Sequence, residues 1–276
     1  FRLDAAPYLI KREHTPSKGL PETHTVIKKI RAELAPHYPE VILLAEAHLP
    51  IEDTKKYFGN GDECHMVYHF SLMEQMWLAL MRGNTAQVRQ TAQDTFDIPF
   101  NCQWATFLRN HDEISLTTLA PKDRAELVQW LDPHKQYAFK KFRATSMRIA
   151  SVFKGDPRKI ITAIKLLYSL PGAPIMYYGD EIGMLNLPLQ DGIIDTRKYL
   201  RGIFDWNEAR HQIQDTQSLL NTLADIIRGV PHDNFLYEFW RILLFLLSGA
   251  RRMMQKRNSF RLRSNLFHLK NNRSTD

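Results

Sequence analysis

The chain has 276 residues, of which 44% are hydrophobic and 24% charged, and its formal net charge is +7. This composition is that of a soluble globular protein with one large domain, or one domain and a small appendage. The positive charge is confined to the end of the chain, because the stretch from Arg241 to Asp276 holds nine Lys or Arg and one acidic residue. The remaining chain is near neutral, so the charge does not indicate a nucleic-acid partner.

Cysteine usage and hydropathy argue against a disulfide-stabilised protein, a cysteine metal site and a membrane-spanning protein. The two cysteines, Cys64 and Cys102, follow no metal-ligand spacing and are too few for a disulfide framework, so we expect reduced thiols. The apolar run from Ile242 to Leu247 is much shorter than the roughly 20 residues that span a bilayer. We therefore expect no membrane partner and a cytoplasmic location. Oligomeric state is left open.

Short apolar runs alternate with amphipathic helical stretches along the chain, which predicts βαβ units and a parallel sheet. The run from Val41 to Ala45 is continuous, as in a strand buried on both faces. The predicted strands are Phe1–Ala5, Val41–Ala45, Cys64–Val67, Ala105–Leu108 and Pro174–Tyr178. Four helices are predicted, at 26–34, 72–80, Tyr137–Val152 and Ile160–Tyr168. In the first, Val26, Ile27, Ile30 and Leu34 share one face. In the second, Met73, Met76 and Trp77 are expected in the core.

Acidic residues follow these apolar runs. Asp4, Glu46, Asp112 and the pair Asp180-Glu181 each come directly after a predicted strand or within a few residues of it. In a (β/α)₈ barrel, residues at the carboxyl ends of the strands meet on one face, where the active site forms. Cleavage of a glycosidic bond generally needs two carboxyl groups, one nucleophile and one proton donor. The pattern therefore fits a glycosidase-type site that has one acidic residue more than the two required.

The segments around these acids resemble the α-amylase family (glycoside hydrolase family 13). The resemblance implies an α/β fold, the (β/α)₈ TIM barrel, present here as an incomplete barrel. Strands 4–8 are expected in residues 1–229, and strands 1–3 and the inserted domain are expected to be missing. Residues 230–276 are expected to form a basic tail without an assigned fold. One hypothesis is that a shifted reading frame or a truncation produced this tail, and the alternative is that it binds a partner. The matching segments are Phe1–Tyr8, Leu43–Ala47, Phe107–Glu113 and Gly172–Glu181.

The resemblance also assigns roles. Asp4 matches the nucleophile that forms a covalent glycosyl-enzyme, Glu46 the general acid/base, and Asp112 the residue that stabilises the transition state. Arg2 matches the arginine that orients the nucleophile, and His111 the histidine that binds the sugar. Taken singly, each acid could be a helix cap or surface group, and the histidine could be structural. No cofactor or metal is expected in this chain, and calcium is an option only for the full-length family fold.

Segments outside the shared motifs, such as Gly61–Met66 and Asn101–Ala105, resemble the trehalose synthase branch of the family (maltose α-D-glucosyltransferases). That branch implies a maltose substrate and its isomerisation to trehalose by retaining double displacement. After Met184 the resemblance weakens, with Asp195–Arg201 in place of the expected stretch. An α-glucosidase or amylase-type hydrolase, and a non-catalytic carbohydrate-binding remnant, therefore stay as alternatives.

An open barrel leaves sheet edges uncovered. We therefore expect the 276-residue chain alone to be poorly active, and turnover of maltose at an enzymatic rate that Asp4→Asn abolishes would contradict this.

Overall fold

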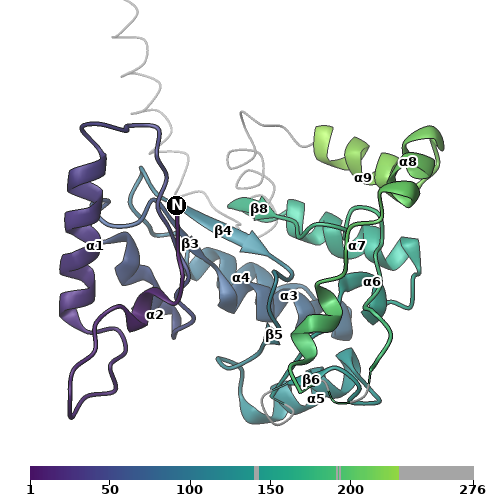
Figure 1. Ribbon diagram of the computed structural model, residues 1–276, viewed down its shortest axis with the longest axis horizontal. Coiled ribbons are helices and arrows are strands. Elements are labelled where there is room, and N and C mark those ends of the chain that lie inside the picture. The colour runs from purple at the N-terminus through teal and green to yellow at the C-terminus, as the bar shows by residue number, and fades with distance from the viewer. Residues whose placement is uncertain (140–142, 191, 193, 230–276) are drawn as a thin grey trace, which may run out of the picture. The chain divides into compact units, whose positions relative to one another are not determined.

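A five-stranded parallel sheet forms the centre of the part of the chain that the structure describes (Figure 1). The computed structural model describes residues 1–139, 143–190, 192 and 194–229, and the predicted tail at 230–276 lies outside these residues. All five predicted strands are confirmed as members of this one sheet; four are shorter than their apolar runs, and the fourth begins two residues before its run. In spatial order they are β1 (Arg2–Leu3), β2 (Leu44–Ala45), β3 (Met66–Tyr68), β4 (Gln103–Phe107) and β8 (Ala173–Ile175).

The strand order is also the chain order. Each strand pairs in parallel with its predecessor in the sheet, from Arg2 opposite Leu44 at one edge to Phe107 opposite Ile175 at the other. A doubly wound sheet reverses direction at a switch point, whereas a barrel adds each strand at the same edge. The order therefore fits part of a (β/α)₈ barrel. It also places the carboxyl ends of all five strands along one edge.

Helical segments connect the strands of this sheet and follow the last one. Figure 1 shows α1 at one end of the view and α8 and α9 at the other. The segments after β1, β2 and β3 are η1 (Ala6–Tyr8), α1 (Pro21–Leu34), α2 (Ile51–Lys55), η2 (Lys56–Phe58), α3 (Phe70–Arg82) and α4 (Ala86–Asp94). Those after β4 and β8 are α5 (Pro121–Leu131), α6 (Ile149–Val152), α7 (Pro157–Tyr168), η3 (Thr196–Leu200), α8 (Trp206–Gln214) and α9 (Leu219–Arg228).

Helix α1 confirms the helix predicted from apolar spacing. It begins at Pro21, whose fixed φ suits the first helical turn. Ile27 is fully buried, and Ile30 and Leu34 pack against the same cluster, which includes Trp104 of β4. The three- and four-residue spacing of these side chains places them on one face of the helix. This face holds α1 against the sheet, beside the strand end that carries Asp4.

Helix α3 confirms the second predicted helix, and Met73, Met76 and Trp77 are buried as expected. The indole Nε1–H of Trp77 donates to the carbonyl oxygen of Leu108 at 2.7 Å. Leu108 comes directly after β4, so this hydrogen bond anchors the start of the loop that carries His111 and Asp112.

The helix predicted over Tyr137–Val152 is wrong. Among the described residues of this window only α6, at its end, is helical, and two strands of a small antiparallel sheet lie here instead. The Asp132 carboxylate accepts hydrogen bonds from the backbone N–H groups of Gln136 and Tyr137, at 3.0 and 2.8 Å, which diverts them from helical bonding. The sheet consists of β5 (Ile114–Ser115), β7 (Ala144–Thr145) and β6 (Ala138–Phe139), in that spatial order. The helix predicted at Ile160–Tyr168 is confirmed as α7.

Candidate functional site

A single guanidinium group links the first two predicted acids. Arg2 Nη1 lies 2.7 Å from Asp4 Oδ1, and Arg2 Nη2 lies 2.7 Å from Glu46 Oε2. Arg2 belongs to β1 and Glu46 follows β2, so two adjacent strands supply the group. Because both carboxyl groups contact one planar guanidinium, they are held close together, as the nucleophile and acid of a retaining glycosidase must be.

Backbone hydrogen bonds fix Glu46 beside the end of β1. The Glu46 N–H donates to the Leu3 carbonyl at 3.0 Å, and the Ala6 N–H donates to the Glu46 carbonyl at 3.1 Å. Its side-chain Oε2 also accepts a hydrogen bond from the Ala5 N–H at 3.2 Å. The parallel pairing therefore continues past the strands and carries both acids to the carboxyl edge. The Glu46 side chain is mostly buried, with 17% exposed.

The chemistry of this pair favours an ionised Asp4. The hydrogen bond from Arg2 is the largest cause that lowers the pKa of Asp4, and smaller contributions come from Glu46 and His111. An ionised carboxylate is what a nucleophile requires. The Asp4 side chain is 74% exposed, so solvent can reach it.

His111 and Asp112 lie together on the loop that follows β4. His111 Nε2 is 3.3 Å from Asp112 Oδ2, and the Asp112 N–H donates to the Asn110 side-chain oxygen at 2.9 Å. β1 and β4 belong to one parallel sheet, so the loop after β4 lies at the same carboxyl edge as Asp4, and His111 is one of the groups that lower the pKa of Asp4. The structure therefore brings all five predicted site residues, which are separated by up to about a hundred positions in the sequence, to one edge of the sheet.

Two arginines that the sequence analysis did not assign to the site also contact Asp112. Arg201 Nη2 and Arg197 Nη1 lie 2.6 and 3.2 Å from its Oδ1 atom. Arg201 Nε also donates to the His111 carbonyl oxygen at 2.8 Å. Both arginines belong to the stretch that departs from the trehalose synthase pattern. The only sequence signal was the recurrence of basic residues there.

Tyr68, at the end of β3, is a third residue that the sequence analysis missed. It lies near Arg2 and Glu46, which both act on its pKa, while burial, the largest cause, raises that pKa. Its phenol therefore stays protonated beside the Arg2 guanidinium. Its position directly after the predicted strand Cys64–Val67 was the signal that could have identified it.

Asp180 follows β8 but has a different environment. It is buried, and its Oδ1 lies 3.2 Å from Arg148 Nη1 and 3.6 Å from Arg109 Nη1. Burial, the largest cause, raises its pKa to about 6. The two guanidinium groups, themselves buried, oppose that shift. Asp180 is thus a member of an internal ion-pair cluster and stands apart from the Arg2 site.

The described part of the chain lacks two kinds of feature, a metal-binding cluster and a membrane-spanning helix. There, no three His, Cys, Asp or Glu side chains come together as a metal site. Over the same residues, no helix is both long and apolar enough to cross a membrane. Cys64 and Cys102 are free thiols, as expected, and burial raises the pKa of both.

Comparison with known proteins gives the family. The family model for the α-amylase catalytic domain matches residues 1–140. The trehalose synthase/amylase TreS of Mycolicibacterium smegmatis is 40% identical over 188 residues, which are 67% of this chain and 31% of that protein. The trehalose synthase of Thermus thermophilus is 37% identical over 211 residues, 76% of this chain and 21% of that protein. The chain therefore spans a third or less of the length of these relatives.

Solved structures agree on the fold. Sucrose 6F-phosphate phosphorylase from Thermoanaerobacter thermosaccharolyticum matches 85% of this chain and 49% of its own, with a TM-score of 0.68 at 19% identity. The α-amylase from H. orenii matches 82% of this chain and 42% of its own, with a TM-score of 0.56 at 21% identity. At such identities the likeness concerns the fold alone. Together with the family match, these observations show that the chain belongs to the α-amylase family of glycoside hydrolases and transferases, whose catalytic domain is a (β/α)₈ barrel.

Proposed function

We propose that this chain carries the catalytic residues of a retaining α-glucosyl transferase that isomerises maltose to trehalose. The observation that carries the proposal is the Arg2 guanidinium shared by Asp4 and Glu46, with the pKa of Asp4 lowered. This arrangement supplies an ionised nucleophile beside a second carboxyl group that can handle a proton. The identity to trehalose synthases supports the choice of maltose as substrate.

In the first displacement, a carboxylate oxygen of Asp4 attacks the anomeric carbon of the non-reducing glucosyl unit. The bond from that carbon to the bridging oxygen breaks, and Glu46 gives its proton to the departing oxygen. A covalent glucosyl-Asp4 ester and one free glucose result. Asp112 stabilises the positive charge that develops on the ring, and His111 donates to the bound sugar.

In the second displacement, the retained glucose turns and attacks through its anomeric hydroxyl. Glu46, now ionised, accepts the proton of that hydroxyl, and the bond between the sugar and Asp4 breaks. No water is consumed, and the anomeric configuration of the transferred unit is retained after two inversions. Arg197 and Arg201 hold the Asp112 carboxylate throughout, since both contact its Oδ1 atom.

A hydrolase that uses the same residues is the second candidate. The observation that favours it is the 74% exposure of the Asp4 side chain, because water that reaches the glucosyl ester competes with the retained glucose. Hydrolysis and transfer share the first displacement and differ only in the acceptor.

A covalent trap tests the shared step. The purified chain is incubated for hours with 5-fluoro-α-D-glucosyl fluoride, whose ring fluorine slows breakdown of the ester, and digested for peptide mass spectrometry. We expect a fluoroglucosyl adduct on Asp4, because even slow turnover accumulates the trapped ester. Asp4→Asn should abolish the adduct, and Asp97→Asn, which changes an exposed carboxylate elsewhere, should leave it unchanged. An adduct on another carboxylate would contradict the assignment.

Product analysis separates the two candidates. The chain is incubated with maltose and ¹³C-labelled glucose, and trehalose and glucose are quantified by NMR. Transfer within a closed site predicts trehalose with little label, whereas hydrolysis predicts glucose as the main product. Glucose alone, at a rate that Asp4→Asn abolishes, would replace the transferase proposal by the hydrolase.

A further inference from the structure

Helix α3 carries one buried carboxylate that the proposed reaction does not use. The Glu74 side chain is fully buried, and the other buried residues of this helix are all apolar. Taking a carboxylate out of water is costly, and well-packed apolar side chains often stabilise a core equally well or better. The need for a packed core therefore does not explain Glu74, whereas its contacts give it a role.

The Glu74 carboxylate holds the far end of the loop that carries Asp112. The Thr118 backbone N–H donates to Glu74 Oε1 at 3.1 Å, and the Thr118 hydroxyl donates to Glu74 Oε2. The near end of the loop is held by the same helix, through the hydrogen bond from Trp77 to the Leu108 carbonyl oxygen. Glu74 and Trp77 are three positions apart and therefore share one face of α3. One helix thus holds the loop on both sides of its catalytic residue.

Glu74 also contacts the segment that carries the proposed proton donor, Glu46. His48 follows Glu46 by two residues, and its Nε2 lies 3.5 Å from Glu74 Oε1 and 3.0 Å from the Thr117 hydroxyl oxygen. The His48 ring stacks on Phe70, with ring centroids 4.2 Å apart and an angle of 6° between the planes. Phe70 is the first residue of α3 and lies four positions before Glu74, on the same helix face. The imidazole is therefore held between α3 and the end of the loop.

The alternation of burial in this segment links His48 to the catalytic acid. Ala45, Ala47 and Leu49 are buried, whereas the side chains of Glu46 and His48 are 17% and 18% exposed. In an extended segment, residues that alternate in this way point to opposite sides, so Glu46 and His48 lie on the same side. A shift of His48 would therefore displace the carboxyl group of Glu46.

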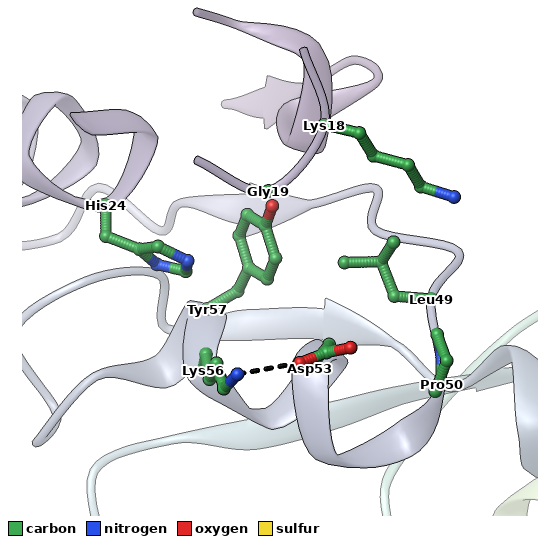
Figure 2. A pocket seen from close by; sticks show the side chains of 8 residues that line it. All are labelled: Lys18, Gly19, His24, Leu49, Pro50, Asp53, Lys56 and Tyr57. Carbon is green, nitrogen blue, oxygen red and sulfur yellow. Dashed lines mark hydrogen bonds and ion pairs between the residues drawn. The ribbon is translucent and has the colours of Figure 1, made fainter. Parts of the chain in front are cut away.

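The buried side of the same segment is incompletely packed. After His48, Leu49 and Pro50 border a cavity of about 280 Å³, which Lys18 and Tyr57 also line (Figure 2). Open space on that side supports the segment less than packed side chains would. The contacts of His48 with α3 therefore contribute more to fixing the segment in place.

We propose that Glu74 is a positioning residue for the proposed reaction. It fixes Asp112 through the end of the loop, and it fixes Glu46 through His48. The group that stabilises the transition state and the group that transfers the proton thereby keep the geometry that the reaction requires. Glu74 touches no substrate and acts only through Thr118 and His48. The inference rests on the proposed function, because it concerns residues that carry that reaction.

The rate of the covalent trap tests this role in the full chain. For each variant, the maximal rate constant of ester formation on Asp4 and the half-saturating concentration of 5-fluoro-α-D-glucosyl fluoride are measured. Glu74→Met keeps the volume but removes both acceptor oxygens, so the maximal rate constant should fall about tenfold or more. The half-saturating concentration should change by less than about threefold, because ground-state binding is retained. Glu74→Gln, which keeps one acceptor oxygen, should stay within about threefold of the wild-type rate constant.

Thr118→Val is a second test that leaves the core intact. Thr118 is exposed, and valine keeps its shape but removes the hydroxyl that donates to Glu74. The maximal rate constant should fall about threefold or more. Thr162→Val is the matched control, since it changes an exposed threonine on α7 whose hydroxyl donates to the Arg158 carbonyl oxygen, and it should leave the rate constant unchanged.

The outcomes separate this inference from the proposed function. An unchanged maximal rate constant in Glu74→Met or in Thr118→Val would overturn the inference and leave the assignment of Asp4 standing. A half-saturating concentration that rises as much as the rate constant falls, or Glu74→Gln as slow as Glu74→Met, would also overturn it. If Glu74→Met does not fold, the result for Thr118→Val decides. Absence of any ester on Asp4 in the wild type would overturn the proposed function, and this inference with it.

Discussion

His69 is the residue whose protonation should govern the acid stability of this domain. It is 1% exposed, and its Nδ1 accepts a hydrogen bond from the Leu72 N–H at 3.2 Å, which caps α3. Nδ1 therefore carries no proton, and Nε2–H donates to Thr95 Oγ1 at 2.8 Å. Thr95 Oγ1 in turn donates to the Thr91 carbonyl at 2.7 Å. Protonation would destroy the cap and place a charge in the core.

The size of the effect follows from the pKa. Burial, the largest cause, lowers the pKa of His69 from 6.5 to about 3. Below pH 6.5 His69 binds a proton in the unfolded chain but not in the folded chain. The free energy of unfolding therefore falls as pH falls, until about pH 3. Between pH 7 and pH 5, this one imidazole should remove about 2 kcal/mol from the free energy of unfolding.

Urea unfolding at pH 7 and pH 5 measures this contribution against a variant that cannot titrate. His69→Asn keeps a side-chain acceptor for the cap, so its free energy of unfolding should be about 2 kcal/mol less sensitive to this pH change than that of the wild type. His37→Asn, which removes an exposed imidazole, should behave as the wild type. Equal losses in the wild type and His69→Asn would refute the reasoning.

Three further substitutions test other parts of the structure. Asp180→Asn should lower the free energy of unfolding by roughly 3 kcal/mol in a urea titration, because it leaves two buried guanidinium groups without a carboxylate; a loss below about 1 kcal/mol would contradict that role. Gly172→Ala should cost about 2 kcal/mol or more, since φ is 125° and the new Cβ would lie 2.6 Å from Thr106 Cγ2; an unchanged melting temperature would argue against it. Arg2→Met should raise the pKa of Asp4, measured by NMR titration of the carboxyl carbon, because the hydrogen bond from Arg2 is the largest cause of its lowering; an unchanged value would show that Arg2 does not control it.

The strands of the sheet could be predicted because parallel strands buried on both faces need continuous apolar runs. In one such run Leu43 and Ala45 point to the same face and are buried, whereas Ile42, on the other face, is 50% exposed, so the apolar run marks the strand although only one face is fully buried. Four of the five paired segments are shorter than their runs, since apolar residues also line the turns at the strand ends. The predicted meeting of Asp4, Glu46 and Asp112 followed from the same rule, as parallel strands share one carboxyl edge.

The missed features depend on contacts between distant segments. The apolar residues from Tyr137 to Val152 suggested a helix, but the Asp132 carboxylate, which lies outside that window, takes up the backbone N–H of Tyr137. Arg197 and Arg201 reach Asp112 across more than eighty positions. No local periodicity encodes such a contact, and the family resemblance weakens in the segment that makes it.

Asp180 lies at a strand end like the site acids, so position alone does not distinguish it from them. The balance between carboxylate and guanidinium charges around each acid does distinguish them. Asp180 is enclosed by two guanidinium groups and is buried, so its environment already neutralises it. Around Asp4 and Asp112 there are five carboxyl groups and three guanidinium groups linked by ion pairs, which leaves an excess of negative charge. An oxocarbenium-like transition state is positively charged. A partly solvated edge with excess carboxylate can stabilise it, whereas an internal cluster with excess guanidinium cannot.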